Sequence, residues 1–186
     1  MRIISGSHKG RILRPEGLPV RPTTDMAKES LFNILNNYID FEEVKVLDLF
    51  AGTGNISMEF ASRGANAVLS IDVNVRCTDY ISKMTSEFKF TNLTTVRANV
   101  FAFLARPAGS YDVIFADPPY DLPEREKVVE LIFGNKWLAD EGWFIMEHDK
   151  SLSFKDHPFF SEERRYGKIH FTFFRKVVPE SSAKQD

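Results

Sequence analysis

The segment Asp117-Pro118-Pro119-Tyr120 holds the side chains of this sequence that are best suited to chemistry. Each proline fixes its own φ and donates no backbone hydrogen bond, so the carboxylate of Asp117 and the carbonyl of Pro118 are expected to keep set directions. Both groups accept hydrogen bonds, and together they can hold the protons of one amino group. Tyr120 could stack on the ring that carries the amine, which is worth roughly 1–3 kcal/mol. The alternative interpretation is an ordinary proline turn.

An exocyclic amine of a nucleobase is a poor nucleophile because its lone pair is delocalised into the ring. Two acceptors that hold its protons would move the nitrogen toward a tetrahedral shape and direct the lone pair at a methyl group. The segment therefore predicts methylation of an amino group by in-line displacement, with catalysis from positioning and from negative charge near an amine that becomes cationic. Asp117 need not deprotonate the amine first, because the methylated ammonium can lose its proton afterwards to Asp117 or to water.

A second segment with possible chemistry runs from Val44 to Gly54, where an apolar stretch ends in Asp48 and a loop with Gly52 and Gly54 follows. Glycines permit positive φ and the close approach of a ligand, so the loop predicts a binding site at the carboxyl end of a buried strand. A turn without a ligand is the alternative for this loop alone, because a pair of glycines is a weak signal.

Asp72 ends the next predicted strand, 18 positions after Gly54. This is close to the spacing of about 20 at which an acid reaches ribose hydroxyls in nucleotide-binding folds. The alternative for Asp72 is the N-cap of a helix that begins near Asn74. A dinucleotide site would need a third glycine where this chain has Ser57, which disfavours NAD. The loop and the acid together favour another adenosine-containing ligand.

The pattern D-x-x-x-G-x-G from Asp48 to Gly54 resembles the first motif of class I S-adenosylmethionine-dependent methyltransferases. Their cofactor carries no phosphate and needs an acid near its ammonium. Asn99, just beyond the third predicted strand, lies where many methyltransferases direct an acid or amide to the adenine amino group. The resemblance implies that S-adenosylmethionine is the methyl donor and that its site consists of Asp48, Phe50, Gly52, Gly54, Asp72, Asn99 and Asp117. The displacement requires no metal, and the four histidines have no recognisable metal-binding spacing.

The predicted elements bring both segments to one edge of a sheet. Strands and helices alternate after residue 44, which indicates a parallel sheet with helices on both faces. An earlier helix is expected to begin at Thr24 or Asp25 and to carry Tyr38 on its apolar face. The later strands are predicted at 67–72, 93–97, 111–116 and 143–147, and the helices at 55–63, 74–89, 101–105 and 124–133. Segments 163–166 and 169–175 predict a tight hairpin whose last strand is antiparallel. We therefore predict an α/β, Rossmann-like class I methyltransferase fold with a seven-stranded, mostly parallel sheet.

The first 24 residues carry five basic residues against one acidic residue, Glu16, a balance of 5 − 1 = +4 in a chain whose net charge is −2. This segment is predicted to form a β-hairpin appendage with strands at 2–5 and 11–13, and basic arms of this kind often contact phosphate. A solvated surface hairpin is the alternative. The basic residues are Arg2, Lys9, Arg11, Arg14 and Arg21. We expect three parts: this arm (1–24), a methyltransferase domain (25–178) and a polar tail (179–186) that frays.

The composition is typical of one globular domain. The 186 residues are 43% hydrophobic and 13% aromatic, and the small net charge excludes a nucleic-acid polycation. Cys77 is the only cysteine, so no intramolecular disulfide can form, which fits a reducing, cytoplasmic setting. No run approaches the roughly 18 apolar residues of a membrane span, and the amino terminus lacks an apolar signal region. We expect a monomer in the cytoplasm with no membrane partner.

Over nearly its whole length the chain resembles the RsmD-type 16S rRNA (guanine-N2) methyltransferases. The matching motifs are R-I-I-S-G at 2–6, K-G-R at 9–11, R-P-T-T-D at 21–25, E-S-L-F-N at 29–33, D-L-F-A-G-T-G at 48–54, D-P-P-Y at 117–120 and R-Y-G at 165–167. The resemblance implies transfer of a methyl group to N2 of one guanine in small-subunit rRNA, on an assembled or assembling particle, with the basic residues of the arm holding phosphates. Met26 stands where relatives often carry arginine, and Ser57 stands where glycine is frequent. We therefore expect the RNA contact at residue 26 and the helix packing at residue 57 to differ from those of the relatives.

Two other functions are open from the sequence. D-P-P-Y does not separate guanine N2 from adenine N6, so an N6-adenine or other amino methyltransferase acting on nucleic acid is one alternative. The other is a noncatalytic rRNA-binding assembly factor that keeps the fold. The complete set of proposed site residues argues against this second alternative, namely Asp48, Asp72, Asp117, Pro118 and Tyr120.

Overall fold

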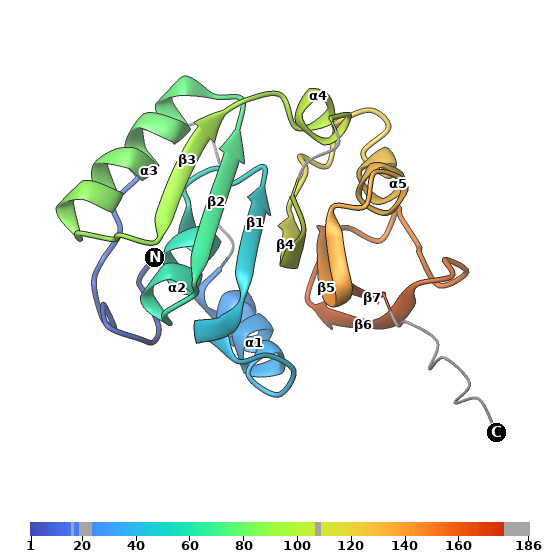
Figure 1. Ribbon diagram of the computed structural model, residues 1–186, viewed down its shortest axis with the longest axis horizontal. Coiled ribbons are helices and arrows are strands. Elements are labelled where there is room, and N and C mark those ends of the chain that lie inside the picture. The colour runs from blue at the N-terminus through green and yellow to red at the C-terminus, as the bar shows by residue number, and fades with distance from the viewer. Residues whose placement is uncertain (16, 19–23, 107–108, 177–186) are drawn as a thin grey trace, which may run out of the picture.

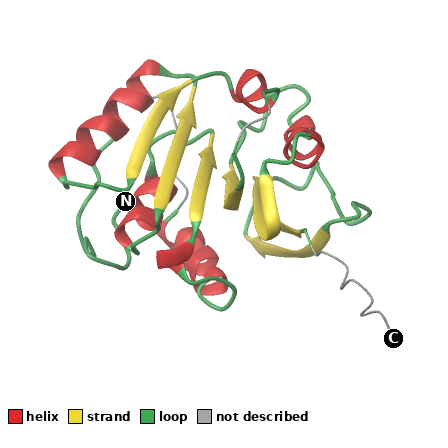
Figure 2. Ribbon diagram, viewed as in Figure 1, coloured by secondary structure: helices red, strands yellow, loops and turns green. Residues whose placement is uncertain are grey.

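The computed structural model describes residues 1–15, 17–18, 24–106 and 109–176, and these residues form a seven-stranded sheet between two layers of helices (Figures 1 and 2). The strands are β1 (Lys45–Leu49), β2 (Ala67–Asp72), β3 (Leu93–Arg97), β4 (Tyr111–Ala116), β5 (Leu138–His148), β6 (Phe160–Tyr166) and β7 (Ile169–Arg175). The helices are α1 (Asp25–Leu35), α2 (Asn55–Ser62), α3 (Val75–Glu87), α4 (Val100–Leu104) and α5 (Lys127–Gly134), with a short 3-10 helix, η1, at Phe41–Glu43. The predicted α/β architecture is confirmed.

The strands lie in the order β3-β2-β1-β4-β5-β7-β6. β1 to β5 are parallel, β7 runs antiparallel to β5, and β6 runs antiparallel to β7. This confirms the predicted mostly parallel sheet with an antiparallel last strand. Because β1 has β2 on one side and β4 on the other, the chain builds the sheet outward in both directions from β1. Open α/β sheets bind ligands where the strand order reverses, outside the carboxyl ends of the strands. The residues that follow β1 and β4 therefore occupy the expected place for a site.

Each face of the sheet packs against its own helices. One buried cluster combines α1, α2 and α3 with strand residues and includes Leu31, Phe60 and Val46. The other combines α4 and α5 with the alternate strand residues and includes Leu47 and Ile132. Neighbouring residues of a strand point to opposite faces, so β1 is apolar on both sides and reads as a continuous hydrophobic stretch. The two layers hold the carboxyl ends of the central strands in fixed positions.

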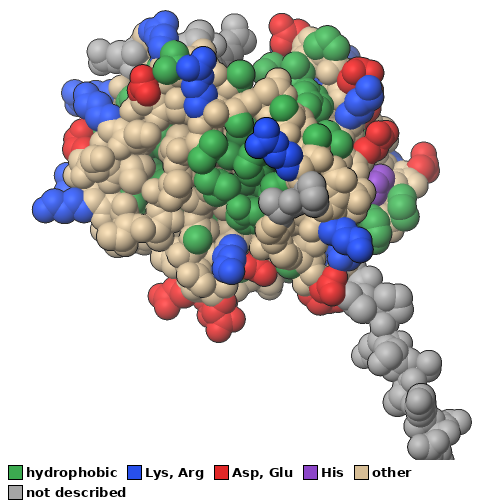
Figure 3. All heavy atoms as spheres, turned by 45° about the horizontal axis from the view of Figure 1, so that its top comes forward, with side chains coloured by type: hydrophobic (Ala, Val, Ile, Leu, Met, Phe, Trp, Pro, Cys, Tyr) green, Lys and Arg blue, Asp and Glu red, His purple; other side chains and the backbone are tan. Residues whose placement is uncertain are grey.

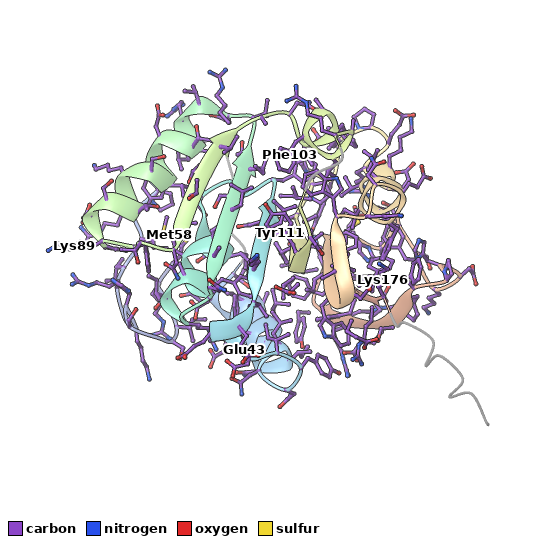
Figure 4. The ribbon with its side chains drawn as sticks, viewed as in Figure 1. Glu43, Met58, Lys89, Phe103, Tyr111 and Lys176 are labelled. Atoms are coloured by element: carbon purple, nitrogen blue, oxygen red, sulfur yellow. The ribbon has the colours of Figure 1, made fainter. Side chains whose placement is uncertain are left out.

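Trp137 anchors the connection between α5 and β5. Its side chain is almost fully buried, and its indole N–H donates to the carbonyl oxygen of Leu104 at 2.9 Å. Phe103 and Tyr111, both labelled in Figure 4, stack on this indole with ring centroids 4.9 and 6.2 Å away. The contact joins α4, β4 and β5, and it thereby supports the segment that follows β4.

The first helix begins as predicted and ends earlier than predicted. The Thr24 hydroxyl accepts a hydrogen bond from Ala27 N at 3.2 Å and caps α1, but the helix ends at Leu35. Tyr38 consequently lies beyond the helix instead of on its apolar face. The residue is 43% exposed, and its ring stacks on Trp143 of β5 with the ring centroids 4.6 Å apart.

Two boundaries near the site also differ from the prediction. β5 begins at Leu138 and not at 143, because Asp140 and Glu141 are exposed charges that hide the strand pattern in the sequence. Glu141 pairs with Arg175, the last residue of β7, and Asp140 pairs with Lys176, which follows that strand. α5 begins at Lys127 and not at 124, since Glu124 has a φ of 56° that a helix does not accommodate.

The N-terminal hairpin lies against the domain more firmly than an appendage would. Its ladder is a single bridge between Arg2 and Ile12, so the predicted strands are present in a shorter form. Ile3 and Leu13 are buried in the cluster that contains α1 and α2. Side chains along the hairpin therefore alternate between the core and solvent: Ile3 and Leu13 are buried, whereas their neighbours Arg2 and Ile12 are exposed.

Candidate active site

Three acidic residues lie at the carboxyl edge of the sheet on neighbouring strands. Asp48 is in β1, Asp117 follows β4, and Glu147 is in β5. Ala116 of β4 is paired with Met146 of β5, and each acid of the β4–β5 pair comes directly after one of these residues. The chain neighbours of all three acids belong to the α4–α5 core, so alternation directs the acids to the face covered by α1 to α3. The arrangement concentrates negative charge at one point of the sheet edge.

Asp48 is held by hydroxyl groups inside the domain. It is 1% exposed, and the hydroxyl of Ser57 in α2 donates a hydrogen bond to its carboxylate. The Ser57 hydroxyl also lies 2.5 Å from the hydroxyl of Ser70 in β2. Burial raises the pKa of Asp48 to about 7, the charge of Asp72 adds to the rise, and the hydrogen bonds from Ser57 oppose it. The serine that stands in place of a frequent glycine is thus a partner of Asp48, a role that the motif did not indicate.

Asp72 fastens the glycine loop to the turn after β2. Its Oδ2 accepts from Gly52 N at 2.8 Å, and its Oδ1 accepts from Asn74 N at 2.8 Å. The N-cap of α3 is Asn74, whose side chain accepts from Arg76 N at 2.9 Å. The alternative in which Asp72 caps this helix is therefore wrong. A contact between Asp72 and a ribose stays a prediction.

The loop after β1 has a left-handed backbone at Phe50, Gly52 and Gly54, with φ of 58°, 53° and 70°. For Phe50, a residue with a Cβ, this conformation costs about 1–2 kcal/mol. Its half-buried ring lies 6.4 Å from the ring of Phe101 in an edge contact. A Cβ at Gly54 would meet Cγ1 of Ile81 at 2.7 Å. The glycine there is required both by φ and by the close packing of α3.

Asn99 caps α4 at the same edge of the sheet. Its side-chain oxygen accepts from Ala102 N at 3.0 Å, and the residue is exposed just beyond the end of β3. A contact with an adenine amino group would use the second lone pair of this oxygen. That contact stays a prediction, whereas the capping role was not predicted.

The D-P-P-Y segment follows β4 directly and lies beside β1. Asp117 N donates to the carbonyl oxygen of Leu49 at 3.4 Å. Pro118 is buried and Tyr120 is 43% exposed. Burial raises the pKa of Asp117 well above its ordinary value, and the charge of Glu147 raises it further. Asp117 therefore keeps its proton to a higher pH than an exposed aspartate does, unless a donor or a cation approaches it.

Arg125 supports Tyr120 from one side. The guanidinium carbon lies 5.6 Å from the centroid of the Tyr120 ring, and Arg125 is 5% exposed. Its Nη2 donates to Asp149 Oδ1 at 2.9 Å and to Ser151 Oγ at 2.5 Å. Within the part of the chain that the structure describes, its Nη1 has no hydrogen-bond partner. Sequence reasoning missed Arg125 because it assigned residue 125 to the start of a helix, where an arginine attracts no notice.

The hairpin predicted to contact RNA presents several cations to solvent. Lys9, Arg11 and Arg14 are exposed, and the guanidinium carbon of Arg11 lies 5.7 Å from the ring centroid of Phe88. Arg2 is exposed as well, but its Nε is 3.9 Å from the carboxylate of Asp25. The fifth predicted contact, Arg21, lies outside the described residues, as does the predicted tail.

His8 docks the hairpin against the end of α3. Its Nε2 lies 2.8 Å from the carbonyl oxygen of Phe88, and its ring centroid is 4.4 Å from that of Phe90. Lys89, between these two residues, is exposed and points away from the domain (Figure 4). It adds a cation beside the hairpin that the sequence did not single out.

A buried ion pair ties the hairpin to α1 and α2. Lys28 and Glu59 are both 0% exposed, and Lys28 Nζ lies 3.2 Å from Glu59 Oε2. The Glu59 carboxylate accepts from Ile4 N and Ser5 N at 2.8 and 3.0 Å. Lys28 Nζ also donates at 2.7 Å to Asn55 Oδ1, the first residue after the glycine loop. One network thus connects the hairpin with the loop.

Figure 3 shows the face that carries the carboxyl ends of β1, β2 and β3, reached by turning the top of Figure 1 forward. Hydrophobic side chains gather near its middle, and charged side chains of both signs lie around them. The hydrophobic part of this face suits the stacking of an aromatic ring. In the described ranges, no group of three or more His, Cys, Asp or Glu side chains could hold a metal ion. None of the described helices has the length and apolarity needed to cross a membrane.

Comparison with known proteins identifies relatives along the whole length of the described domain. The family described as Conserved hypothetical protein 95 matches residues 1–175. A protein named ribosomal RNA small subunit methyltransferase D from Buchnera aphidicola subsp. Baizongia pistaciae is 30% identical over 185 residues, which cover 95% of this chain and 92% of the relative. The protein of the same name from Escherichia coli K12 is 34% identical over 150 residues, which cover 80% of this chain and 75% of the relative. A solved structure named "Putative methyltransferase yhhF from Escherichia coli" superposes with a TM-score of 0.84 at 29% identity, covering 96% of this chain and 99% of that one.

Proposed function

The chain belongs to the Conserved hypothetical protein 95 family, the RsmD-type family that its motifs resemble, and from this premise we propose that it methylates the N2 amine of a guanine in 16S rRNA with S-adenosylmethionine as methyl donor. Two relatives that match most of the chain carry the name ribosomal RNA small subunit methyltransferase D. The observation that carries the proposal is the position of D-P-P-Y directly beside the glycine loop, where β1 and β4 are neighbours.

The donor site fits a cationic cofactor without phosphate. Burial raises the pKa of Asp48 to about 7, and a cation bound nearby would offset the cost of its ionisation. Bound S-adenosylmethionine would supply a methyl group on a sulfonium. In this proposal Asp48 provides charge for the cofactor, Asp72 faces its ribose, and Asn99 faces its adenine. Phe50, Gly52 and Gly54 give the loop its shape beside them.

The acceptor amine is assigned to Asp117 and Pro118. The carboxylate of Asp117 and the carbonyl of Pro118 would accept the two amine protons, which directs the nitrogen lone pair toward the donor site. Tyr120 would stack on the base, since its ring is 43% exposed and is backed on one side by Arg125. As the amine becomes cationic, the carboxylates at the sheet edge stabilise it. Its proton then leaves to Asp117 or to water.

The rRNA is assigned to the hairpin and its surroundings. We propose that residues 1–24 form the RNA-binding part, that residues 25–178 form the methyltransferase domain, and that Arg2, Lys9, Arg11, Arg14 and Arg21 contact phosphates. Phosphate contacts provide affinity but little sequence information. The target is therefore selected by RNA shape and by extrusion of the base toward Asp117.

The test is identification of the methylated nucleoside. The protein is incubated with 30S subunits or free 16S rRNA from cells that lack its gene, using S-adenosylmethionine labelled in the methyl group, and the RNA is digested to nucleosides. We expect N2-methylguanosine, identified by mass spectrometry. Detection of N6-methyladenosine without N2-methylguanosine would show that the protein methylates adenine N6 and not guanine N2. Failure to bind S-adenosylmethionine in calorimetry would instead support the noncatalytic assembly factor.

A further inference from the structure

Arg125 makes a close contact with the ring of Tyr120 although it belongs to no motif. It lies in the turn that connects D-P-P-Y with α5. Its guanidinium carbon lies over the Tyr120 ring, 5.6 Å from the centroid, which is within the range of a cation–π contact. Arg125 is 5% exposed, whereas Tyr120 is 43% exposed. A buried guanidinium therefore supports one face of a ring that is still open to a ligand.

We propose that Arg125 is a positioning residue that fixes the Tyr120 ring in the orientation in which the target base stacks on it. The proposal rests on the proposed methylation of a base beside Asp117, and it adds a residue that does not touch the base. A fixed ring would hold the stacked base with its amine at Asp117 and Pro118. A mobile ring would let the bound base take several orientations, so fewer encounters would lead to methyl transfer.

Asp149 neutralises the guanidinium at a place where positive charge would oppose the reaction. The amine becomes cationic as it is methylated, and an unpaired cation nearby would raise the energy of that state. Arg125 Nη2 donates to Asp149 Oδ1 at 2.9 Å. Burial raises the pKa of the Tyr120 hydroxyl, and beyond that the charge of Asp149 raises it and the charge of Arg125 lowers it. The ion pair thus offers the ring a flat support with little net charge.

Asp149 is itself held by its neighbours in the chain and in the sheet. Its Oδ1 accepts from Ser151 Oγ at 2.5 Å and from Ser151 N at 3.1 Å, and the same Oγ accepts from Arg125 Nη2 at 2.5 Å. The Nδ1 of His148, which is 0% exposed, lies 2.7 Å from the carbonyl oxygen of Asp149. The Nε2 of His148 lies 2.7 Å from the hydroxyl of Thr172 in β7. A chain of contacts therefore runs from the core of the sheet to the guanidinium.

A role in stability alone is the alternative, and two observations argue against it. Nη1 of Arg125 is buried and has no hydrogen-bond partner among the described residues. A buried N–H without a partner lowers stability, so an arginine that served stability alone would be expected to use this donor. The side chain of Asp149 is 31% exposed, and solvent weakens such an ion pair. The arrangement is therefore better suited to holding the ring than to stabilising the fold.

The experiment is a double-mutant cycle between Arg125 and Tyr120. Single-turnover transfer of a labelled methyl group to 30S subunits or 16S rRNA from cells that lack the gene is measured for wild type, Arg125→Met, Tyr120→Ala and the double variant. Methionine is a long side chain without a charged plane. We expect Arg125→Met to lower the rate about 3- to 30-fold and Tyr120→Ala to lower it about 5- to 150-fold. When Tyr120 is already alanine, the arginine change should lower the rate by less than about 2-fold.

Binding measurements and a matched control separate positioning from a general loss of structure. Arg125→Met should keep the affinities for S-adenosylmethionine and 16S rRNA within about 2-fold of wild type, because the loss concerns the rate of the bound complex. The control is Arg175→Met. The Arg175 guanidinium carbon lies 5.1 Å from the ring centroid of Trp143, and its Nη2 pairs with Glu141 at 2.8 Å. It has the same two kinds of contact in another part of the sheet, so its removal should leave the rate unchanged.

The outcomes distinguish this proposal from the proposed function. If wild type methylates the RNA but Arg125→Met lowers the rate equally with and without the Tyr120 ring, the positioning role is wrong and the proposed function stands. If wild type transfers no methyl group to the RNA, the proposed function itself fails. An equal loss of rate in Arg175→Met would assign the effect to stability. If Arg125→Met does not fold, Asp149→Ala takes its place in the cycle, because it frees the guanidinium from a partly exposed position, and additive effects would again overturn the proposal.

Discussion

The hydroxyl of Ser57, in the first turn of α2, donates a hydrogen bond to the buried carboxylate of Asp48 in β1. The same hydroxyl lies 2.5 Å from that of Ser70 in β2. Two strands and a helix therefore meet at one polar point between apolar layers. The hydrogen bonds from Ser57 lower the pKa of Asp48 while burial raises it. The charge of the proposed donor site consequently depends on a residue of the helix and not only on the glycine loop.

Ser57→Ala is expected to weaken both stability and cofactor binding. Loss of a hydrogen bond to a buried carboxyl costs about 2 kcal/mol of the free energy of unfolding. It also leaves the pKa of Asp48 higher, so the affinity for S-adenosylmethionine falls at about pH 7 and recovers at about pH 9, where the carboxyl is ionised in both proteins. Calorimetry at the two pH values and urea unfolding measure these effects. Ser86→Ala, on the exposed side of α3, is the control, and an affinity loss that is equal at both pH values would contradict the explanation.

Asp48 predicts a specific dependence of stability on pH. Its pKa rises on folding from 3.8 to about 7, so between these values the folded protein binds more protons than the unfolded chain. The contribution of Asp48 is complete below the lower value and is lost as pH rises through the upper one. A shift of this size corresponds to roughly 4 kcal/mol. Urea unfolding between about pH 4 and about pH 8 should show a smaller decrease in stability for Asp48→Asn than for wild type. Parallel curves would show that Asp48 does not titrate in this range.

Asp117→Asn is expected to separate chemistry from cofactor binding. The amide keeps the shape of the side chain but replaces one acceptor by a donor, so the single-turnover rate should fall about 100- to 10,000-fold while S-adenosylmethionine still binds. In wild type the rate should rise with pH, because the raised pKa of Asp117 must be passed before the carboxylate can accept the amine proton. Asp121→Asn, an exposed acid just after Tyr120, is the matched control. An unchanged single-turnover rate for Asp117→Asn would remove this residue from the chemistry.

Local patterns were sufficient for the strands and for the two motifs. The predicted bounds are confirmed for β2, β3, β4 and β7, because each is a short apolar or alternating run of residues that is bounded by polar or turn-forming residues. Elements with charged ends were harder to predict. Asp140 and Glu141 hid the start of β5, and the positive φ of Glu124, which no sequence pattern indicates, delayed the start of α5.

The parts of the site that sequence could not provide depend on pairing between distant segments. Ser57 looked like a departure from a glycine pattern until the structure placed its hydroxyl on Asp48. Glu147 became visible through the pairing of β4 with β5, although the rule that parallel strands end at one edge could have pointed to it. Arg125 reaches Tyr120 and Asp149 through an irregular turn. Such contacts are set by register and by loop geometry, which leave no local signal.

The basic hairpin predicts a change in the salt dependence of RNA binding. Arg11→Glu with Arg14→Glu should weaken binding to 16S rRNA and make the plot of log affinity against log salt shallower by about 1–2. The control is Lys127→Glu on α5, which packs on the opposite face of the sheet from the hairpin. Filter binding over a range of KCl concentrations provides the slopes. Equal slopes for the hairpin variant and wild type would place the rRNA elsewhere on the protein.

Glu59→Gln tests whether the buried network holds the hairpin on the domain. The change leaves the fully buried Lys28 without its charge partner and weakens the acceptor of Ile4 N and Ser5 N. Removal of one partner of a buried ion pair costs about 3–5 kcal/mol, because the other charge stays desolvated. Urea unfolding should show this loss, and hydrogen exchange should accelerate at Ile4 and Ser5 before it does in β1.

The exposed pair of Glu124 with Lys127 provides the contrast. Its atoms lie 2.5 Å apart, closer than those of the buried pair, yet both side chains are about half exposed or more. Solvent screens such a pair and can replace its hydrogen bonds, so Glu124→Gln should change neither unfolding nor exchange at the hairpin. If Glu59→Gln behaves like Glu124→Gln, the hairpin is held by its other contacts, such as the burial of Ile3 and Leu13 and the docking of His8 on Phe88. If it loses stability without faster exchange at Ile4 and Ser5, the ion pair stabilises α1 and α2 but does not hold the hairpin. Unfolding and hydrogen exchange together therefore distinguish the stability that the buried ion pair provides from its role in attaching the hairpin, the proposed RNA-binding segment.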